Sequence, residues 1–189
     1  MSKLNLVWLA VMATLSHIVN AEVFINPPAE VIRIAVSLEY KDFPTAADIL
    51  TIARDESSFN PFASNKDSKG IMQVNFGSFN VFENMSQGVE ILREYFLRTG
   101  SKVSAIQAYN IGIGNFLKGK FKDSGKQYLQ LFNRRYKSYE NYVEQYRSRL
   151  RNTINSTSDG IGDEAMVRLA RRNVLAFNRR GYYGLHPCW

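Results

Sequence analysis

Residues 54–64 of the chain read RDESSFNPFAS and residues 70–73 read GIMQ, and these two stretches decide the fold. Upstream of them, apolar residues recur at helical spacing behind Thr45, which predicts a helix that begins at Thr45 and ends near Glu56. Residues 57–78 are rich in Ser, Asn, Pro and Gly and predict an irregular segment with one or two short elements. Glu56 is therefore expected where a helix gives way to a loop.

The surroundings expected for Glu56 are largely apolar, because Phe and Pro follow it at residues 59–62 and Ile71 and Met72 come from the GIMQ stretch. Desolvation disfavours the charged form of a carboxyl group and raises its pKa, which a general acid near neutral pH requires. Taken alone, the stretch favours a structural Glu56 that caps the helix or pairs with Arg54.

A second stretch, residues 105–115, reads AIQAYNIGIGN. It predicts a helix that ends in Tyr109 and Asn110, so that a phenol and an amide stand at a tight turn before two glycines. Both groups can hydrogen-bond a ligand or orient a carboxyl group. By itself this pattern is also that of an ordinary helix C-terminus.

The rest of the chain predicts further helices and weak strand patterns, so the fold class is all-α or α-dominant. A capping box at Asn84 and Gln87 is expected to start a helix that stops at Gly100. The other expected helices cover residues 31–38, 103–109, 135–150 and 163–178.

Three parts are predicted from composition. Residues 1–21 carry Lys3 and a short apolar run and end in Val19-Asn20-Ala21, with small or apolar residues three and one before a cut after Ala21. This is typical of a secretory signal peptide; an uncleaved membrane anchor is the alternative. Residues 22–151 form the main domain. Residues 152–189 comprise a polar hinge at residues 152–162, then a basic helix and tail. That helix either docks on the domain or grips an anionic polymer or lipid.

Composition limits the chemistry. The 189-residue chain has only two His and one Cys, which excludes the usual Cys/His zinc site and leaves no well-placed His for Ser-His-Asp or Cys-His nucleophiles. It has 24 Lys and Arg against 17 Asp and Glu, a net charge of +7 that favours anionic partners such as cell-wall polymer. Nucleic-acid binding through the basic and aromatic residues 134–139 is an alternative explanation of the positive charge, but the predicted export argues against it.

Together, the blocks ESSFNPFA, GIMQ and AYNIGIG resemble the lytic transglycosylase domain of the soluble lytic murein transglycosylase type. The resemblance spans roughly residues 28–149 and gains support from GVEIL at residues 88–92 and from Tyr142-Val143. It implies a goose-lysozyme-like, mostly helical fold and cleavage of peptidoglycan without a metal or cofactor.

By this resemblance, Glu56 is the catalytic acid and base. The implied substrate-binding residues are Ser57, Ser64, Met72, Gln73, Tyr109, Asn110 and Tyr142, with the Tyr109 hydroxyl expected against the Glu56 carboxyl. Four departures from the family pattern put the contacts of the 63–70 loop and of the last family helix in doubt: a shorter loop, Asp67 for glycine, Ser138 for glutamate and Tyr139 for threonine.

The implied reaction breaks the β-1,4 bond between N-acetylmuramic acid and N-acetylglucosamine and leaves a 1,6-anhydro product. Most glycosidases use two carboxylates, and the nearest second candidates are Asp55 and Asp67. A hydrolytic goose-type lysozyme therefore stays open, as does a non-catalytic wall-binding module of a virion or secretion apparatus. We expect a monomer, periplasmic or secreted, or alternatively membrane-anchored or virion-associated, with secretion, conjugation or virion machinery as a further partner.

Overall fold

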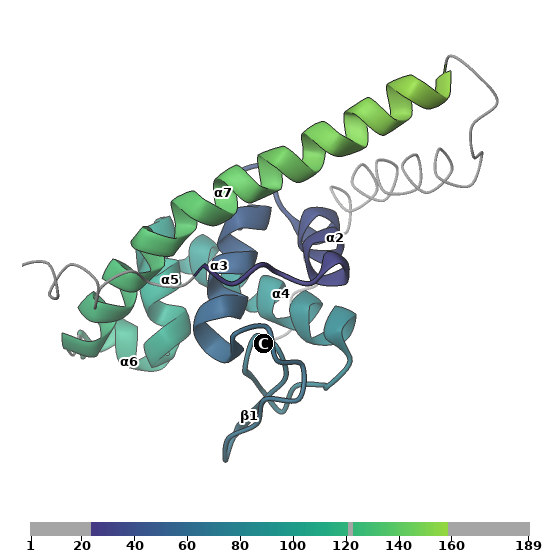
Figure 1. The fold of residues 1–189 in the computed structure, drawn as a ribbon. Helices are drawn as coiled ribbons and strands as arrows, with labels where there is room; N and C mark the ends of the chain where they lie inside the picture. The colour runs from purple at the N-terminus through teal and green to yellow at the C-terminus, as the bar shows by residue number, and fades with distance from the viewer. Residues whose placement is uncertain (1–23, 121–122, 159–189) are drawn as a thin grey trace, which may run out of the picture.

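The computed structural model describes residues 24–120 and 123–158. Within them, helices and one small antiparallel hairpin surround a central helix, α3 (Figure 1). The elements in chain order are α2 (Ala29–Leu38), α3 (Ala46–Ser57), β1 (Ser68–Lys69), β2 (Val74–Asn75), α4 (Val81–Thr99), α5 (Lys102–Ile111), α6 (Ile113–Leu117) and α7 (Asp123–Ser158). The α-dominant fold predicted from the sequence is confirmed.

Helix α3 is the core of the domain. It begins at the predicted cap, because the Thr45 side chain accepts a hydrogen bond from the Asp48 backbone N–H and the Asp48 carboxylate accepts one from the Thr45 N–H. Ile49, Leu50 and Ile52 are completely buried. Helices α2 and α7 pack on α3, so an apolar helix in the middle of the domain presents its C-terminal end to the loop that follows.

Helix α4 begins four residues earlier than the sequence pattern predicted. Its N-cap is Asn80, whose side chain accepts a hydrogen bond from the Glu83 N–H at 3.0 Å. The capping role predicted for Asn84 is wrong, because Asn84 lies inside the helix with its side chain buried. The predicted end at Gly100 is confirmed, with Gly100 in the left-handed conformation at φ 67°.

Helix α7 is longer at both ends than the predicted helix over residues 135–150. Its C-terminal end extends past the other described helices (Figure 1). It runs through residues 152–158, so the hinge predicted there is wrong for that part. The remainder of the hinge, the helix over 163–178 and the signal segment over 1–21 lie outside the described residues, and the domain boundary stays a prediction.

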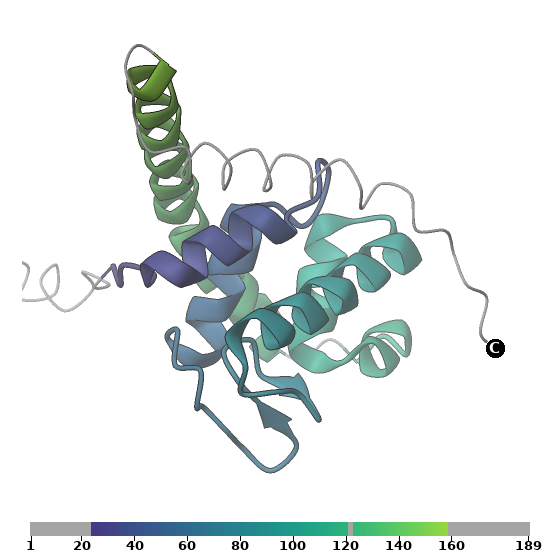
Figure 2. The ribbon, with the colours of Figure 1, turned by 90° about the vertical axis from the view of Figure 1, so that its right-hand side faces the viewer.

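The hairpin and the connecting loops lie below the C-terminal end of α3, beside the start of α4 (Figure 2). Ser68 pairs with Asn75 and Lys69 with Val74. This agrees with the predicted irregular segment containing short elements. In the described part of the chain, no helix combines the length and apolar character needed to cross a membrane.

Candidate active site

Glu56 stands in the last turn of α3, as the sequence predicted. The chain then turns sharply, because Ser58 and Phe59 both adopt left-handed backbone conformations, at φ 57° and 66°. Such conformations are costly for residues other than glycine and are concentrated at functional sites. The Arg54 guanidinium donates to Ser58 Oγ at 2.9 Å and thereby fastens this turn.

The Glu56 carboxylate is largely buried and accepts a hydrogen bond from the Tyr128 hydroxyl at 3.0 Å. Burial raises the pKa of Glu56 from 4.5 to about 7, the Tyr128 hydrogen bond opposes this rise, and the neighbouring Asp55 charge adds to it. A carboxyl group with this pKa is part protonated and part ionised near neutral pH. It can donate a proton in one step and accept one in the next.

The donor to Glu56 is therefore Tyr128, from the first part of α7, rather than Tyr109 as predicted. The Tyr109 hydroxyl donates to the Met72 carbonyl oxygen at 2.7 Å instead. Burial raises the pKa of both phenols, so both remain protonated and act as donors. The physical reason for the difference is that α7 begins earlier than predicted and brings Tyr128 over the end of α3.

Ser57 and Asn84 hold the GIMQ stretch against the end of α3. The Ser57 hydroxyl donates to the Ile71 carbonyl at 2.7 Å, which uses its proton within the protein. From α4, the Asn84 side-chain oxygen accepts from the Met72 N–H at 2.8 Å, and its nitrogen donates to the Lys69 carbonyl at 2.8 Å. Asn84 thus clamps both ends of this stretch, a role that the sequence pattern did not reveal.

Gln73 braces the hairpin loop. Its side-chain nitrogen donates to the carbonyl oxygens of Ala63 and Gly70 at 3.0 and 2.8 Å, and its oxygen accepts from the Asn65 amide at 3.1 Å. Ser64 lies exposed and forms a backbone bridge with Lys69. The predicted residue Ser64 therefore lies in the loop before β1, and Gln73, in the loop between β1 and β2, bonds its neighbour Ala63.

The other three predicted substrate-binding residues, Met72, Asn110 and Tyr142, lie in three different environments. The Met72 side chain is completely buried in the core, so only its backbone faces Tyr109. Asn110 is exposed at the end of α5. Tyr142 packs near Phe24, with ring centroids 6.0 Å apart, and lies 14 residues after Tyr128, which is about 21 Å along α7.

The nearest second carboxylate, Asp55, forms an ion pair with Arg135 of α7. The Asp55 side chain is only 3% exposed, which leaves little access for a substrate. Asp67 lies exposed directly before β1. Asp55 is therefore not placed as the free, substrate-facing partner that a two-carboxylate glycosidase requires.

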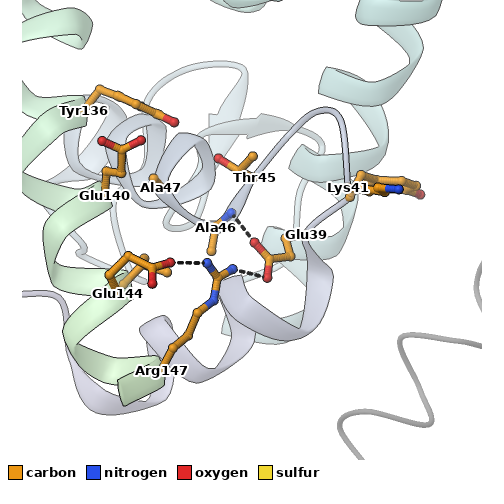
Figure 3. A pocket seen from close by; sticks show the side chains of 11 residues that line it. Glu39, Lys41, Thr45, Ala46, Ala47, Tyr136, Glu140, Glu144 and Arg147 are labelled. Atoms are coloured by element: carbon orange, nitrogen blue, oxygen red, sulfur yellow. Dashed lines mark hydrogen bonds and ion pairs between the residues drawn. The ribbon is translucent and has the colours of Figure 1, made fainter. Parts of the chain in front are cut away.

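A cavity of about 270 Å³ lies at the opposite end of α3 from Glu56, between the α2–α3 loop and α7 (Figure 3). Arg147 pairs there with Glu39 and Glu144, and Glu39 also accepts from the Ala46 N–H at 3.0 Å. Ala46 and Glu56 are ten residues apart on α3, which corresponds to about 15 Å. This cavity is thus separate from the Glu56 site.

Part of the chain matches a known protein family. Residues 44–132 match the family described as the Transglycosylase SLT domain. Searches of curated proteins and of solved structures found no significant match. The matched segment begins before α3 and ends within α7, so it contains Glu56, the clamped GIMQ stretch and Tyr128. Residues 44–132 therefore match a transglycosylase domain of the SLT type, and this similarity supports lytic transglycosylase-type activity and peptidoglycan as the substrate.

Proposed function

We propose that this chain is a peptidoglycan lytic transglycosylase in which Glu56 is the single acid and base. The bond cleaved is the β-1,4 link from N-acetylmuramic acid to N-acetylglucosamine, and the product carries 1,6-anhydro-N-acetylmuramic acid. The observation that carries the proposal is a largely buried Glu56 whose pKa is raised to about 7, within a segment that matches this family.

In the first step, the protonated Glu56 carboxyl donates its proton to the bridging oxygen. The bond between that oxygen and muramic C1 breaks, and the N-acetylglucosamine end leaves with a hydroxyl group. The 2-acetamido oxygen of the same muramic residue stabilises the positive charge that develops at C1. The Tyr128 hydroxyl, at 3.0 Å, stabilises the carboxylate that this step creates.

In the second step, the Glu56 carboxylate takes the proton of the muramic C6 hydroxyl, and the C6 oxygen forms the new bond to C1. Glu56 is then protonated again and ready for the next cycle. This sequence needs only one carboxylate, in agreement with an Asp55 that is held by Arg135. A carboxyl pKa near the working pH suits a group that must serve as acid and then as base.

The products released from purified peptidoglycan test this mechanism. We expect mass spectrometry to find muropeptides that end in 1,6-anhydro-muramic acid, each lighter by one water than its hydrolysed counterpart. Reducing-end muramic acid as the dominant product would instead identify a hydrolytic lysozyme. Intact peptidoglycan after prolonged incubation would favour a non-catalytic wall-binding module.

Tyr128→Phe is expected to move the pH profile of cleavage. The variant keeps the ring but removes the hydrogen bond that favours the charged form of Glu56, so the pKa of Glu56 should rise further above its present value near 7. Cleavage requires a protonated Glu56 at the start, and the alkaline limb of the profile should shift upward by about one pH unit. The measurement is the initial rate of muropeptide release between pH 5 and 9.

Tyr109→Phe is the matched control, because its hydroxyl bonds the Met72 carbonyl and not the carboxylate. It should lower the free energy of unfolding by about 1 kcal/mol and leave the alkaline limb in place. An unmoved limb in Tyr128→Phe, or a limb moved equally by both variants, would contradict the role assigned to Tyr128.

The location and partners of the enzyme are part of the proposal. Export through residues 1–21 would deliver it to the cell wall, or anchor it at the membrane if this segment is retained. The positive net charge of +7 would favour accumulation on anionic wall polymers. Cell fractionation with and without residues 1–21 tests the location.

A further inference from the structure

Four phenylalanine side chains are exposed between residues 62 and 82. Phe62 and Phe76 are 75% and 94% exposed, and Phe79 and Phe82 are 43% and 45% exposed. We name this set the phenylalanine patch. Single exposed apolar residues are common on proteins, but several that come together mark a surface that binds a partner or ligand.

Two members of the patch, Phe62 and Phe79, are in ring contact, and Phe76 and Phe82 lie within three residues of Phe79 in the sequence. The rings of Phe62 and Phe79 have centroids 6.3 Å apart, although Phe62 follows α3 and Phe79 precedes α4. The Lys69 ammonium lies 5.7 Å from the centroid of the Phe79 ring. Phe76 directly follows β2, and Phe82 lies in the first turn of α4. The patch therefore combines an apolar surface with an adjacent positive charge.

The fold does not need Phe76 at its position. Its backbone is left-handed, at φ 54°, where glycine and asparagine are favoured and a bulky side chain is strained. Its side chain is 94% exposed and so contributes little burial to the stability of the domain. A strained and exposed aromatic residue without a packing role fits a function at the surface.

The patch is continuous with the loop that borders the Glu56 turn. Phe62 belongs to the turn that follows α3, and its backbone N–H donates to Asn60 Oδ1 at 3.0 Å. The residue after Phe62, Ala63, accepts a hydrogen bond from the Gln73 side chain, which also bonds Gly70 and Asn65. Apolar rings, amide groups and a lysine thus share one side of the domain.

The geometry points to the phenylalanine patch as a platform for the peptidoglycan glycan strand beyond the bond that Glu56 cleaves. Pyranose rings have an apolar face that can cover an aromatic ring, and the carboxylates of the stem peptides that the strand carries match the charge of Lys69. Phe76, Phe79 and Phe82 lie outside the motif blocks that carry the family resemblance, and Phe62 lies within the ESSFNPFA block. The inference rests on the proposed function for the identity of the strand.

The test measures binding to purified sacculi, with the full chain carrying Glu56→Gln so that the strand is not consumed. We expect Phe76→Ser with Phe79→Ser to weaken binding about tenfold, since each lost ring contact with an apolar surface weakens binding severalfold. The matched control is Leu97→Ser with Leu117→Ser, because both leucines are 63% exposed and lie outside the patch. The control should bind within about twofold of the parent.

Two further arms identify the ligand. Sacculi stripped of stem peptides should still bind in a patch-dependent way, because the pyranose rings of the strand remain. Binding to anionic lipid vesicles tests a membrane as the partner. Light scattering tests whether a second copy of the chain binds instead. Patch-dependent vesicle binding without sacculus binding, or a patch-dependent dimer, would overturn the inference. So would sacculus binding by the serine variant within twofold of the parent.

Failure of this inference and failure of the proposed function give different results. If the chain with its native Glu56 releases no muropeptide while sacculus binding still depends on the patch, the catalytic proposal fails and the platform stands. If release is normal and the two serine substitutions change neither binding nor release, the platform fails and the catalytic proposal stands. Thermal unfolding of both double variants should match the parent, because all four side chains replaced are exposed.

Discussion

Glu56→Gln is expected to abolish glycan cleavage, with a loss of about 10⁴-fold in rate, at the upper end of what general acid–base catalysis contributes. The amide keeps the shape of the side chain and can still accept the Tyr128 hydrogen bond, but it has no transferable proton. The measurement is muropeptide release from purified peptidoglycan at pH 6. A variant that retains more than about a tenth of the activity would remove Glu56 from its proposed role.

The same substitution should make the protein more stable above neutral pH. The pKa of Glu56 is raised from 4.5 to about 7 in the fold, so the folded state holds this proton more tightly than the unfolded chain does. Between these two values, the free energy of unfolding falls as pH rises, and above pH 7 the full cost of the buried charge, about 3 kcal/mol, is present. Glu56→Gln removes this cost, so its advantage should be absent below pH 4.5 and largest at pH 8.

The control for both measurements is Glu94→Gln. Glu94 lies exposed on α4 and pairs with Arg98 at 2.7 Å, an i,i+4 surface pair. Such a pair contributes less than about 1 kcal/mol, so this variant should keep the activity and the pH dependence of the parent. A variant at Glu56 that unfolds like the control at every pH would show that burial of the carboxylate has no cost.

The predicted helices were those with strong local signals. Thr45 fixes the start of α3 through a capping box, and Gly100 ends α4 in a left-handed conformation, both of which depend on residues close in sequence. The error at Asn84 has the same origin. The chain contains two adjacent capping-box patterns, Asn80 with Glu83 and Asn84 with Gln87. Only the tertiary structure decides which of them starts the helix.

The sequence predicted the position of Glu56 but not its hydrogen-bond donor. Glu56 occupies the predicted end of α3, but its hydrogen-bond donor, Tyr128, is 72 residues away in the sequence and belongs to no motif. Met72 was expected at the cleft because its motif lies there, and it is buried because its side chain packs against Gly88 of α4. Contacts of this kind depend on how α7 packs on α3 and how α4 packs beside α2 and α5, and no local sequence pattern predicts them.

The departure at Tyr139 also gains a structural reason. The Tyr139 ring is buried against Phe24 and Phe59, with centroids 5.0 and 5.8 Å away, and its hydroxyl donates to the Ile25 carbonyl at 3.0 Å. Tyr139 thus attaches the segment before α2 to α7. Tyr139, whose position in the family pattern suggested a ligand contact, therefore packs in the core instead.

Gly70→Ala is expected to cost about 3 kcal/mol or more in the free energy of unfolding, since it adds a severe overlap to left-handed strain. Gly70 has φ 79°, and a Cβ there would lie 2.4 Å from Asn84 Nδ2 and 2.5 Å from the Ser78 carbonyl oxygen. The backbone oxygen cannot move aside cheaply. Asn84 would have to give up its bonds to Met72 and Lys69, which hold the GIMQ stretch.

Gly100→Ala separates the overlap from the strain. Gly100 has φ 67°, almost the same conformation, yet a Cβ there would meet no atom within 4 Å. This control should lose only about 1 kcal/mol, the cost of a left-handed alanine. Urea unfolding monitored by far-UV circular dichroism gives both values.

Equal losses in the two variants would mean that Asn84 does not clamp the loop. A larger loss in Gly70→Ala together with reduced muropeptide release would instead link this clamp to the geometry around Glu56, because Ser57 bonds the Ile71 carbonyl next to Gly70.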